Sequence, residues 1–118
     1  MNKRKQHQDL TGTNFKRKIG KVNLYIQVFH YRNRLTRVLL RGAHHDQDTR
    51  QFLAGVQDLI NLCLDYSIPA EEIYNCISLH RGETEGFMNM GSVTKHAVGI
   101  LDAIGKVLKE EYPNGKKK

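Results

Sequence analysis

The sequence predicts an α+β fold in which a small antiparallel sheet, an N-terminal hairpin, packs against two main helices and one short helix. Period-two alternation over residues 22–41 indicates two strands, and helical periodicity over residues 52–66 and 93–112 indicates the two main helices. The strand-like segments precede the helix-like segments, which indicates helices that cover one face of the sheet. The 118 residues suffice for one ordinary domain.

The hairpin is predicted from alternation on both sides of a turn. Apolar side chains at every second position of residues 22–28 share one side, so one face of this strand lies on the core. Residues 31–34 are polar and contain Asn33, which predicts the turn, and residues 35–41 form the second strand. Because a two-stranded sheet is marginal alone, we expect a further strand from residues 79–88 or from a partner subunit.

The first main helix is predicted to begin at Asp48, which caps it together with Gln51. Apolar residues then recur at helical spacing from Phe52 to Tyr66, on a stripe wide enough to predict deep burial. Pro69 suits the first turn of the short helix that follows.

The last helix is predicted to be capped by Ser92 and to run over residues 93–112, until proline, asparagine and glycine end it. Residues 79–91 contain three glycines, which predicts loops or bent strand between the short helix and this last helix. Cys63 and Cys76 fall within helix-like apolar patterns, so we expect buried free thiols in a reducing compartment.

The formal net charge is +7, and its distribution decides what it implies. We expect residues 1–18 to form a flexible basic arm and residues 113–118 a basic tail, on either side of one domain over residues 19–112. Residues 22–115 hold nine basic and eleven acidic side chains, so the folded body is close to neutral. Binding of nucleic acid by the basic tails is therefore an alternative rather than the first hypothesis.

Membrane insertion and secretion are not expected from the sequence. No run approaches about 18 consecutive apolar residues, so no membrane span is predicted. The basic N-terminus is not followed by an apolar run, so no secretory signal is predicted either. We expect a cytoplasmic protein.

The segment from Gly91 to Lys95 is the strongest candidate for an anion site. It places a glycine, Ser92, Thr94 and Lys95 at the predicted start of a helix, where free N–H groups and the dipole favour an anion. It is not a phosphate-binding P-loop, because no GxxxxGK precedes it. The alternative is that Ser92 only caps the helix and that Lys95 is solvated.

Five further residues complete the candidate ligand-binding set. Phe87 and Asn89 suit stacking on a base and recognition of its edge, although core packing of Phe87 is the alternative. Arg41 and His45 can line an anionic pocket where the second strand meets the following loop. Arg81 adds a cation in the glycine-rich segment.

No catalytic or metal-binding constellation is predicted. His44, His45 and Asp46 are adjacent in a loop, with no further ligand indicated by spacing. The acid–base groups of residues 80–85 show no sign of convergence, and GxSxG is absent. We therefore expect a binding protein that is not an enzyme and that requires no cofactor or metal.

Four segments of the chain together resemble the TSCPD domain: residues 22–26, the loop before residues 52–64, residues 67–73 and residues 99–105. This domain occurs at the C-terminal end of cobalamin-dependent ribonucleotide reductases. The Ser-Cys-Pro-Asp of its name is absent here, and Asp102 is the part that survives, followed by Ala103 and Ile104. The reductase tail's cysteine pair and the catalytic barrel are missing as well.

As a free-standing domain of this type, the chain is similar to the phage Thoeris anti-defence sponge family. The resemblance implies a homo-oligomer that binds a cyclic ADP-ribose-type or cyclic oligonucleotide signal without cleaving it, in the host cytoplasm if the protein is phage-encoded. Three alternatives remain open. They are an accessory protein of ribonucleotide reductase, a nucleic-acid-binding protein that uses its tails, and an enzyme acting on a small phosphorylated substrate.

Overall fold

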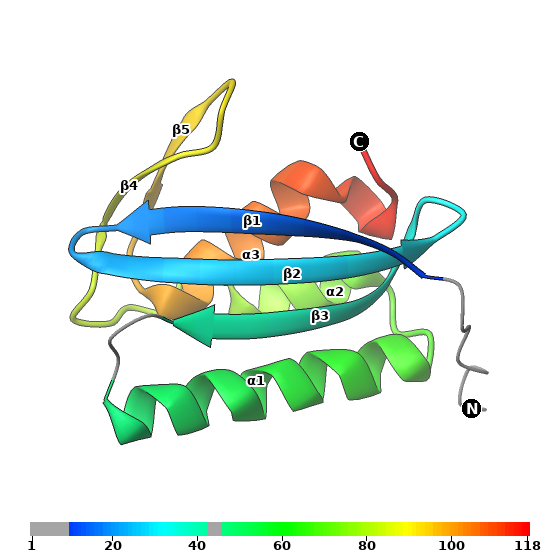
Figure 1. Ribbon diagram of the computed structural model, residues 1–118, viewed down its shortest axis with the longest axis horizontal. Helices are drawn as coiled ribbons and strands as arrows, with labels where there is room; N and C mark the ends of the chain where they lie inside the picture. Colours follow the sequence, from blue (N-terminus) through cyan, green and yellow to red (C-terminus); the bar gives the residue numbers. More distant parts are fainter. Residues whose placement is uncertain (1–9, 43–45) are drawn as a thin grey trace.

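The computed structural model describes residues 10–42 and 46–118 and has the predicted α+β fold (Figure 1). The elements in chain order are β1 (Thr11–Ile19), β2 (Val22–Tyr31), β3 (Arg34–Gly42), α1 (Gln47–Asp65), α2 (Ala70–Ile77), β4 (Gly86–Asn89), β5 (Thr94–Ala97), α3 (Ile100–Glu111) and the 3₁₀ turn η1 (Pro113–Gly115). The predicted hairpin over residues 22–41 is thus confirmed as β2 and β3.

A third strand completes the main sheet, in the order β1-β2-β3, with all pairs antiparallel. This strand is β1, so the flexible arm predicted over residues 1–18 is wrong from Thr11 onward, whereas residues 1–9 lie outside the described part. The error arose because β1 is rich in cations. From Gly12 onward, the residues of β1 alternate between exposed and partly or fully buried. This is the pattern of a strand with one solvent-exposed face.

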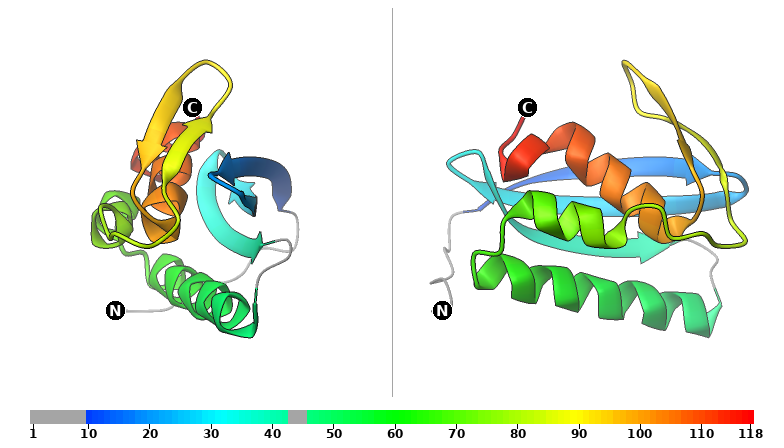
Figure 2. Two further views of the ribbon diagram at one scale, coloured as in Figure 1. Left: turned by 90° about the vertical axis from the view of Figure 1, so that its left-hand side faces the viewer. Right: turned by 180° about the vertical axis from the view of Figure 1, so that it is seen from behind.

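Helices α2 and α3 cover one face of the main sheet and leave the other face uncovered by helices (Figures 1 and 2). The hydrophobic core lies between the sheet and these helices. The strand residues that point into it include Leu24, Ile26 and Val38, all less than 2% exposed. Ile104 and Leu108 of α3 are buried in the same cluster. Burial of these side chains fixes which face of each strand points to the helices.

Helix α1 lies alongside the edge strand β3 instead of covering the sheet (Figure 1). The Asn61 side chain accepts a hydrogen bond from Val38 N (2.8 Å) and donates one to Val38 O (3.0 Å). Leu40 N donates to Gln57 Oε1 (3.0 Å). The predicted deep burial of this helix is wrong, since Leu59 is 63% exposed. A helix on a sheet edge contacts the protein along one side only.

The first turn of α1 is capped by Asp46, whose Oδ1 accepts a hydrogen bond from Thr49 N at 2.7 Å. The predicted capping by Asp48 is therefore wrong by two residues, because Asp48 already lies inside the helix. Pro69 precedes α2 directly, as predicted for a helix start.

Replacing Gly55 with alanine is expected to raise the free energy of unfolding by about 0.5–1 kcal/mol, because alanine favours the helix. Gly55 lies within α1, with no atom within 4 Å of the position that a Cβ would take. Urea denaturation measures the change. Gly105→Ala in α3 is the matched control and is expected to destabilise, since Ser78 Oγ lies 2.9 Å from the added Cβ. A loss of stability in Gly55→Ala would contradict the open surroundings of this site.

The second sheet is a hairpin of β4 and β5. The bent strand predicted within residues 79–91 corresponds to β4, whereas β5 was not predicted. β4 pairs antiparallel with β5, and the turn between them is closed by Met90 N donating to Val93 O at 2.8 Å. Gly91 adopts φ +84°, which a turn requires. The helix predicted from Ser92 therefore begins only at Ile100. Residues 79–85 form no strand, and the expected further strand of the main sheet is β1 instead.

The basic tail predicted over residues 113–118 is packed against the sheet end. Lys116 forms a β-bridge with Arg34, and Lys117 N donates to Asn33 O at 2.6 Å. Both cysteines are free, but Cys76 is exposed, so its predicted burial is wrong, and Cys63 is half-buried. Among the described helices, none has the length and apolarity to cross a membrane.

Candidate functional site on the open face

The face of the main sheet opposite α2 and α3, named here the open face, carries the outward side chains of three strands. They alternate with the core residues, as β geometry requires. Register places them in cross-strand rows. The open face consists of Gly12, Asn14, Lys16, Lys18, Asn23, Tyr25, Gln27, Phe29, Arg37, Leu39 and Arg41.

One row of the open face places an aromatic ring between two cations. Tyr25 of β2 pairs with Lys16 of β1 on one side and with Arg41 of β3 on the other. The Lys16 ammonium lies 5.7 Å from the centroid of the Tyr25 ring, which is within cation–π range. Tyr25 is 38% exposed. A hollow of about 620 Å³ opens over this row and is lined by Asn14, Phe15, Lys16, Tyr25, Ile26, Gln27, Leu39, Arg41 and Gly42.

A second hollow, of about 690 Å³, adjoins the first because Lys16 lines both. Its other lining residues are Lys18, Gly20, Asn23, Phe87 and Asn89. Phe87 projects from β4 and is 71% exposed, with His96 of β5 edge-on at 5.0 Å between ring centroids. The hairpin approaches the β1–β2 turn closely at Gly86, where an added Cβ would lie 3.1 Å from Gly20 N.

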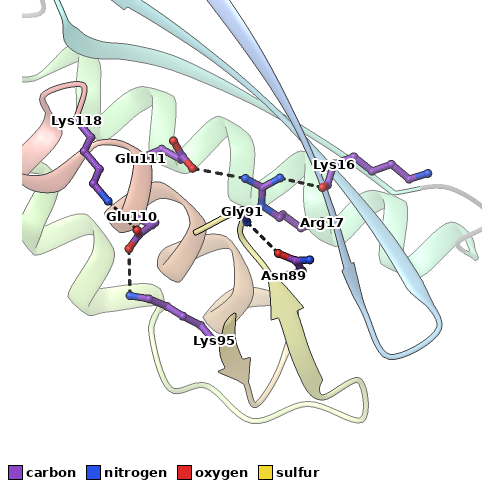
Figure 3. Close-up of polar contacts among 8 residues, drawn as sticks. All are labelled: Lys16, Arg17, Asn89, Gly91, Lys95, Glu110, Glu111 and Lys118. Carbon is purple, nitrogen blue, oxygen red and sulfur yellow. Dashed lines mark hydrogen bonds and ion pairs between the residues drawn. The ribbon is translucent and has the colours of Figure 1, made fainter. Parts of the chain in front are cut away.

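The electrostatics of the open face are strongly positive. Residues 10–42 contain eight Lys and Arg side chains and no carboxylate. Arg17 points to the helix side and pairs with Glu111 of α3 at 3.5 Å (Figure 3). Within the described chain, no ion pair to a carboxylate is found for Lys16, Lys18 or Arg41. These cations therefore remain available to an anionic ligand.

Three of the predicted ligand residues lie on this connected surface. Arg41 lines the first hollow, and Phe87 and Asn89 line the second. The alternative of Phe87 in the core is excluded by its exposure. Asn89 also accepts a hydrogen bond from Gly91 N at 3.0 Å, which stabilises the hairpin turn (Figure 3).

The other predicted residues are not brought to this surface. Ser92 and Thr94 lie in the β4–β5 hairpin, and the Lys95 side chain turns to α3, where it pairs with Glu110 at 3.4 Å (Figure 3). The helix start at Ser92, on which the predicted anion site depends, is wrong, because Thr94–Ala97 form β5 and α3 begins only at Ile100. Arg81 lines a separate hollow of about 480 Å³, and His45 lies outside the described residues.

The sequence reasoning missed Lys16, Lys18 and Tyr25. Tyr25 lies on the side of β2 opposite the apolar side chains, as the alternation predicts, but the pattern assigns it no role. The two lysines were assigned to a flexible arm. Alternation over residues 13–19, with Phe15 and Ile19 on one side, is the signal that could have identified β1 and its exposed cations.

Asp102 is a buried carboxylate that organises the chain behind the β4–β5 hairpin. Its oxygens accept hydrogen bonds from Leu79 N (2.8 Å), Val98 N (3.0 Å) and Lys106 Nζ (2.7 Å). Burial by itself raises the pKa of this carboxyl, but the three hydrogen bonds together lower the pKa below its ordinary value. Every strong contact of Asp102 is internal, so we assign it a structural role.

Within residues 10–42 and 46–118, no group of three or more His, Cys, Asp or Glu side chains is arranged to hold a metal ion. Comparison with known proteins then gives one match. The family model of the TSCPD domain matches residues 2–112 of the chain. No curated protein and no solved structure matches the chain.

Proposed function

We propose, from the premise that this chain belongs to the TSCPD domain family, that it is a non-catalytic protein that sequesters a phosphorylated nucleotide signal. The TSCPD domain is related to the C-terminal regions of ribonucleotide reductases, which act on nucleotides. The ligand class that we propose is a cyclic ADP-ribose-type molecule or a cyclic oligonucleotide, held on the open face. We also propose that the protein is a cytoplasmic homo-oligomer.

The row formed by Lys16, Tyr25 and Arg41 is the observation that supports this proposal. A base can stack on the exposed Tyr25 ring, and the two flanking cations can each bind a phosphate. Cyclic nucleotide signals combine these two features at short distance. The absence of carboxylates from residues 10–42 removes the repulsion that a phosphate would otherwise meet.

Sequestration is favoured over turnover by the chemistry of the lining. The two hollows are lined, among the described residues, by amides, cations, aromatic rings and apolar groups, without a carboxylate or an imidazole. General acid–base catalysis most often uses a histidine or a carboxylate within hydrogen-bond reach of the reacting atoms. A ligand bound here is therefore expected to leave unchanged.

Calorimetry against cyclic ADP-ribose isomers and cyclic di- and trinucleotides tests the proposal. We expect stoichiometric binding of at least one of them, and release of the intact molecule on denaturation, identified by mass spectrometry. Heat from none of them would overturn the proposal. Recovery of a cleaved product would show an enzyme instead.

Replacing Tyr25 with leucine is expected to weaken binding of the signal molecule by roughly 5- to 150-fold, because base–aromatic stacking contributes about 1–3 kcal/mol. The thermal midpoint should change little, since the side chain is 38% exposed. Phe52→Leu is the matched control, because Phe52 is a comparably exposed ring on α1, with an exposed fraction of 42%. Equal losses in both variants, measured by calorimetry, would contradict a stacking role for Tyr25.

The family match favours a second candidate function, an accessory protein of a separate ribonucleotide reductase. In that case, the purified protein should bind a reductase subunit and no free cyclic nucleotide. Size-exclusion chromatography of the mixture with reductase, run beside the calorimetry, separates the two candidates.

A further inference from the structure

We propose that the open face binds single-stranded nucleic acid in an extended conformation, with several bases of one strand on separate aromatic rings. This inference rests on the proposed function in one respect, since the Tyr25 row is the nucleotide-binding row in both. It goes further because it assigns a role to two rings that a single small ligand on Tyr25 does not reach.

The rings lie along one path over the sheet. Tyr25 and Phe29 are both outward residues of β2, four residues apart, so they are separated by about 13 Å along the strand. Phe87 lies beyond Asn23, across the second hollow. One base cannot stack on two rings at such a spacing, so the path suits a chain of linked nucleotides.

Phe29 is accommodated by a glycine on the neighbouring strand. Gly12 pairs with Phe29, and a Cβ on Gly12 would lie 3.1 Å from the Cε1 atom of the ring. The ring therefore leans over β1, in the space that a side chain at position 12 would fill. Phe29 is half-buried by this contact, which holds the ring in place on the surface of the sheet.

Cations accompany the rings along the same path. Arg37 is the cross-strand partner of Phe29, Lys16 and Arg41 flank Tyr25, and Lys18 lies opposite Asn23 on the way to Phe87. Phosphates in a single strand lie between successive bases, so a surface that alternates rings with cations complements the polymer. Duplex bases are already stacked and cannot use the rings.

Charge complementarity selects a polyanion for this face in particular. Residues 10–42 hold eight cations and no carboxylate, whereas residues 46–118 hold eleven carboxylates and eight Lys and Arg side chains. Four of these cations, Lys16, Lys18, Arg37 and Arg41, lie on the open face, so this face is positively charged in the folded protein. An extended polyanion is drawn to the sheet and kept away from the helices.

Fluorescence anisotropy with labelled oligo(dT) and oligo(rU) of about eight nucleotides tests the inference, beside a dinucleotide and a duplex of the same length. We expect the octamers to bind at least about tenfold more tightly than the dinucleotide and the duplex, and to weaken steeply with added salt. The two oligomers show whether ribose or deoxyribose is preferred.

Variants test whether octamers bind along the aromatic rings and cations of the open face. Phe87→Leu and Arg37→Gln are expected to weaken octamer binding about fivefold or more, whereas Arg81→Gln, which removes an exposed arginine in a separate hollow, is expected to leave it unchanged. Affinity that is independent of length, equal binding of duplex, or equal effects of all three variants would overturn the inference.

The two proposals fail separately. Tight octamer binding without any bound cyclic nucleotide would overturn the sponge and leave the polymer site standing. Binding of a cyclic nucleotide, with octamers bound no more tightly than the dinucleotide, would overturn the polymer site and leave the sponge standing.

Discussion

Replacing Asp102 with alanine is expected to lower the free energy of unfolding by about 2–5 kcal/mol, because each buried polar group left unpaired costs about 1–3 kcal/mol. The carboxylate is fully buried and accepts hydrogen bonds from two backbone N–H groups and from Lys106. Alanine leaves Leu79 N and Val98 N without this acceptor, whereas Lys106 Nζ still donates to His96 O. Most small domains are stable by about 5–15 kcal/mol, so this loss is a large share of the total.

Urea denaturation of Asp102→Ala, Asp102→Asn and a surface control measures the effect. Asp58→Ala on the exposed side of α1 is the control and is expected to change stability by less than about 0.5 kcal/mol. Asp102→Asn keeps the shape and one acceptor oxygen, so it should lose less than alanine. A loss below about 1 kcal/mol in Asp102→Ala would contradict the structural role.

The contribution of Asp102 should also depend on pH. Its pKa is lowered in the folded protein, so its stabilisation is complete above the unfolded pKa of about 3.9 and is lost as the pH falls through the lower folded value. The stability difference between wild type and Asp102→Asn should therefore be constant from about pH 5 upward and shrink below it. A difference that grows on acidification would contradict the lowered pKa.

Replacing Asn61 with alanine is expected to destabilise the protein by about 2–4 kcal/mol, because each buried polar group left unpaired costs about 1–3 kcal/mol. Asn61 is 5% exposed and pairs with both backbone groups of Val38, so its amide takes the place of a neighbouring strand at the β3 edge. The variant leaves the N–H and the C=O of Val38 without partners. Urea denaturation measures the loss.

Gln57→Ala is the matched comparison, since Gln57 accepts a single hydrogen bond from Leu40 N in a partly buried place. It is expected to cost about 1 kcal/mol. Amide hydrogen exchange gives a local readout, and Val38 N–H should lose protection in Asn61→Ala more than in Gln57→Ala. An uncovered strand edge also promotes pairing with other chains, so aggregation of Asn61→Ala is expected at high concentration. Retained protection of Val38 would contradict the assigned hydrogen bonds.

Local sequence patterns predicted those elements in which apolar residues recur regularly, either at every second position or at helical spacing. Strands β2 and β3, helix α1 and the start of α2 after Pro69 follow directly from such patterns. Their apolar positions recur without interruption, so no knowledge of distant segments was needed. Within the candidate site, this allowed Arg41 to be placed correctly at the end of a strand.

Two elements could not be predicted from local pattern because distant contacts decide them. β1 carries Lys16 and Lys18 on its wet face and becomes a strand through pairing with β2. β5 has the cap-like Ser92 before it, yet burial of Ala97 and pairing with β4 favour a strand over a helix. Tertiary context overrides intrinsic propensity in such short segments.

The sequence by itself determined the α+β class, the β2–β3 hairpin, the two main helices and the family of this protein. It also determined the number of cations, but not their place. Only the tertiary structure decided that Lys16, Tyr25 and Arg41 form one row on an uncovered face. The physical reason is that strand register is set by burial of the opposite face against α2 and α3. Side chains far apart in sequence therefore acquire their neighbours only when the core forms.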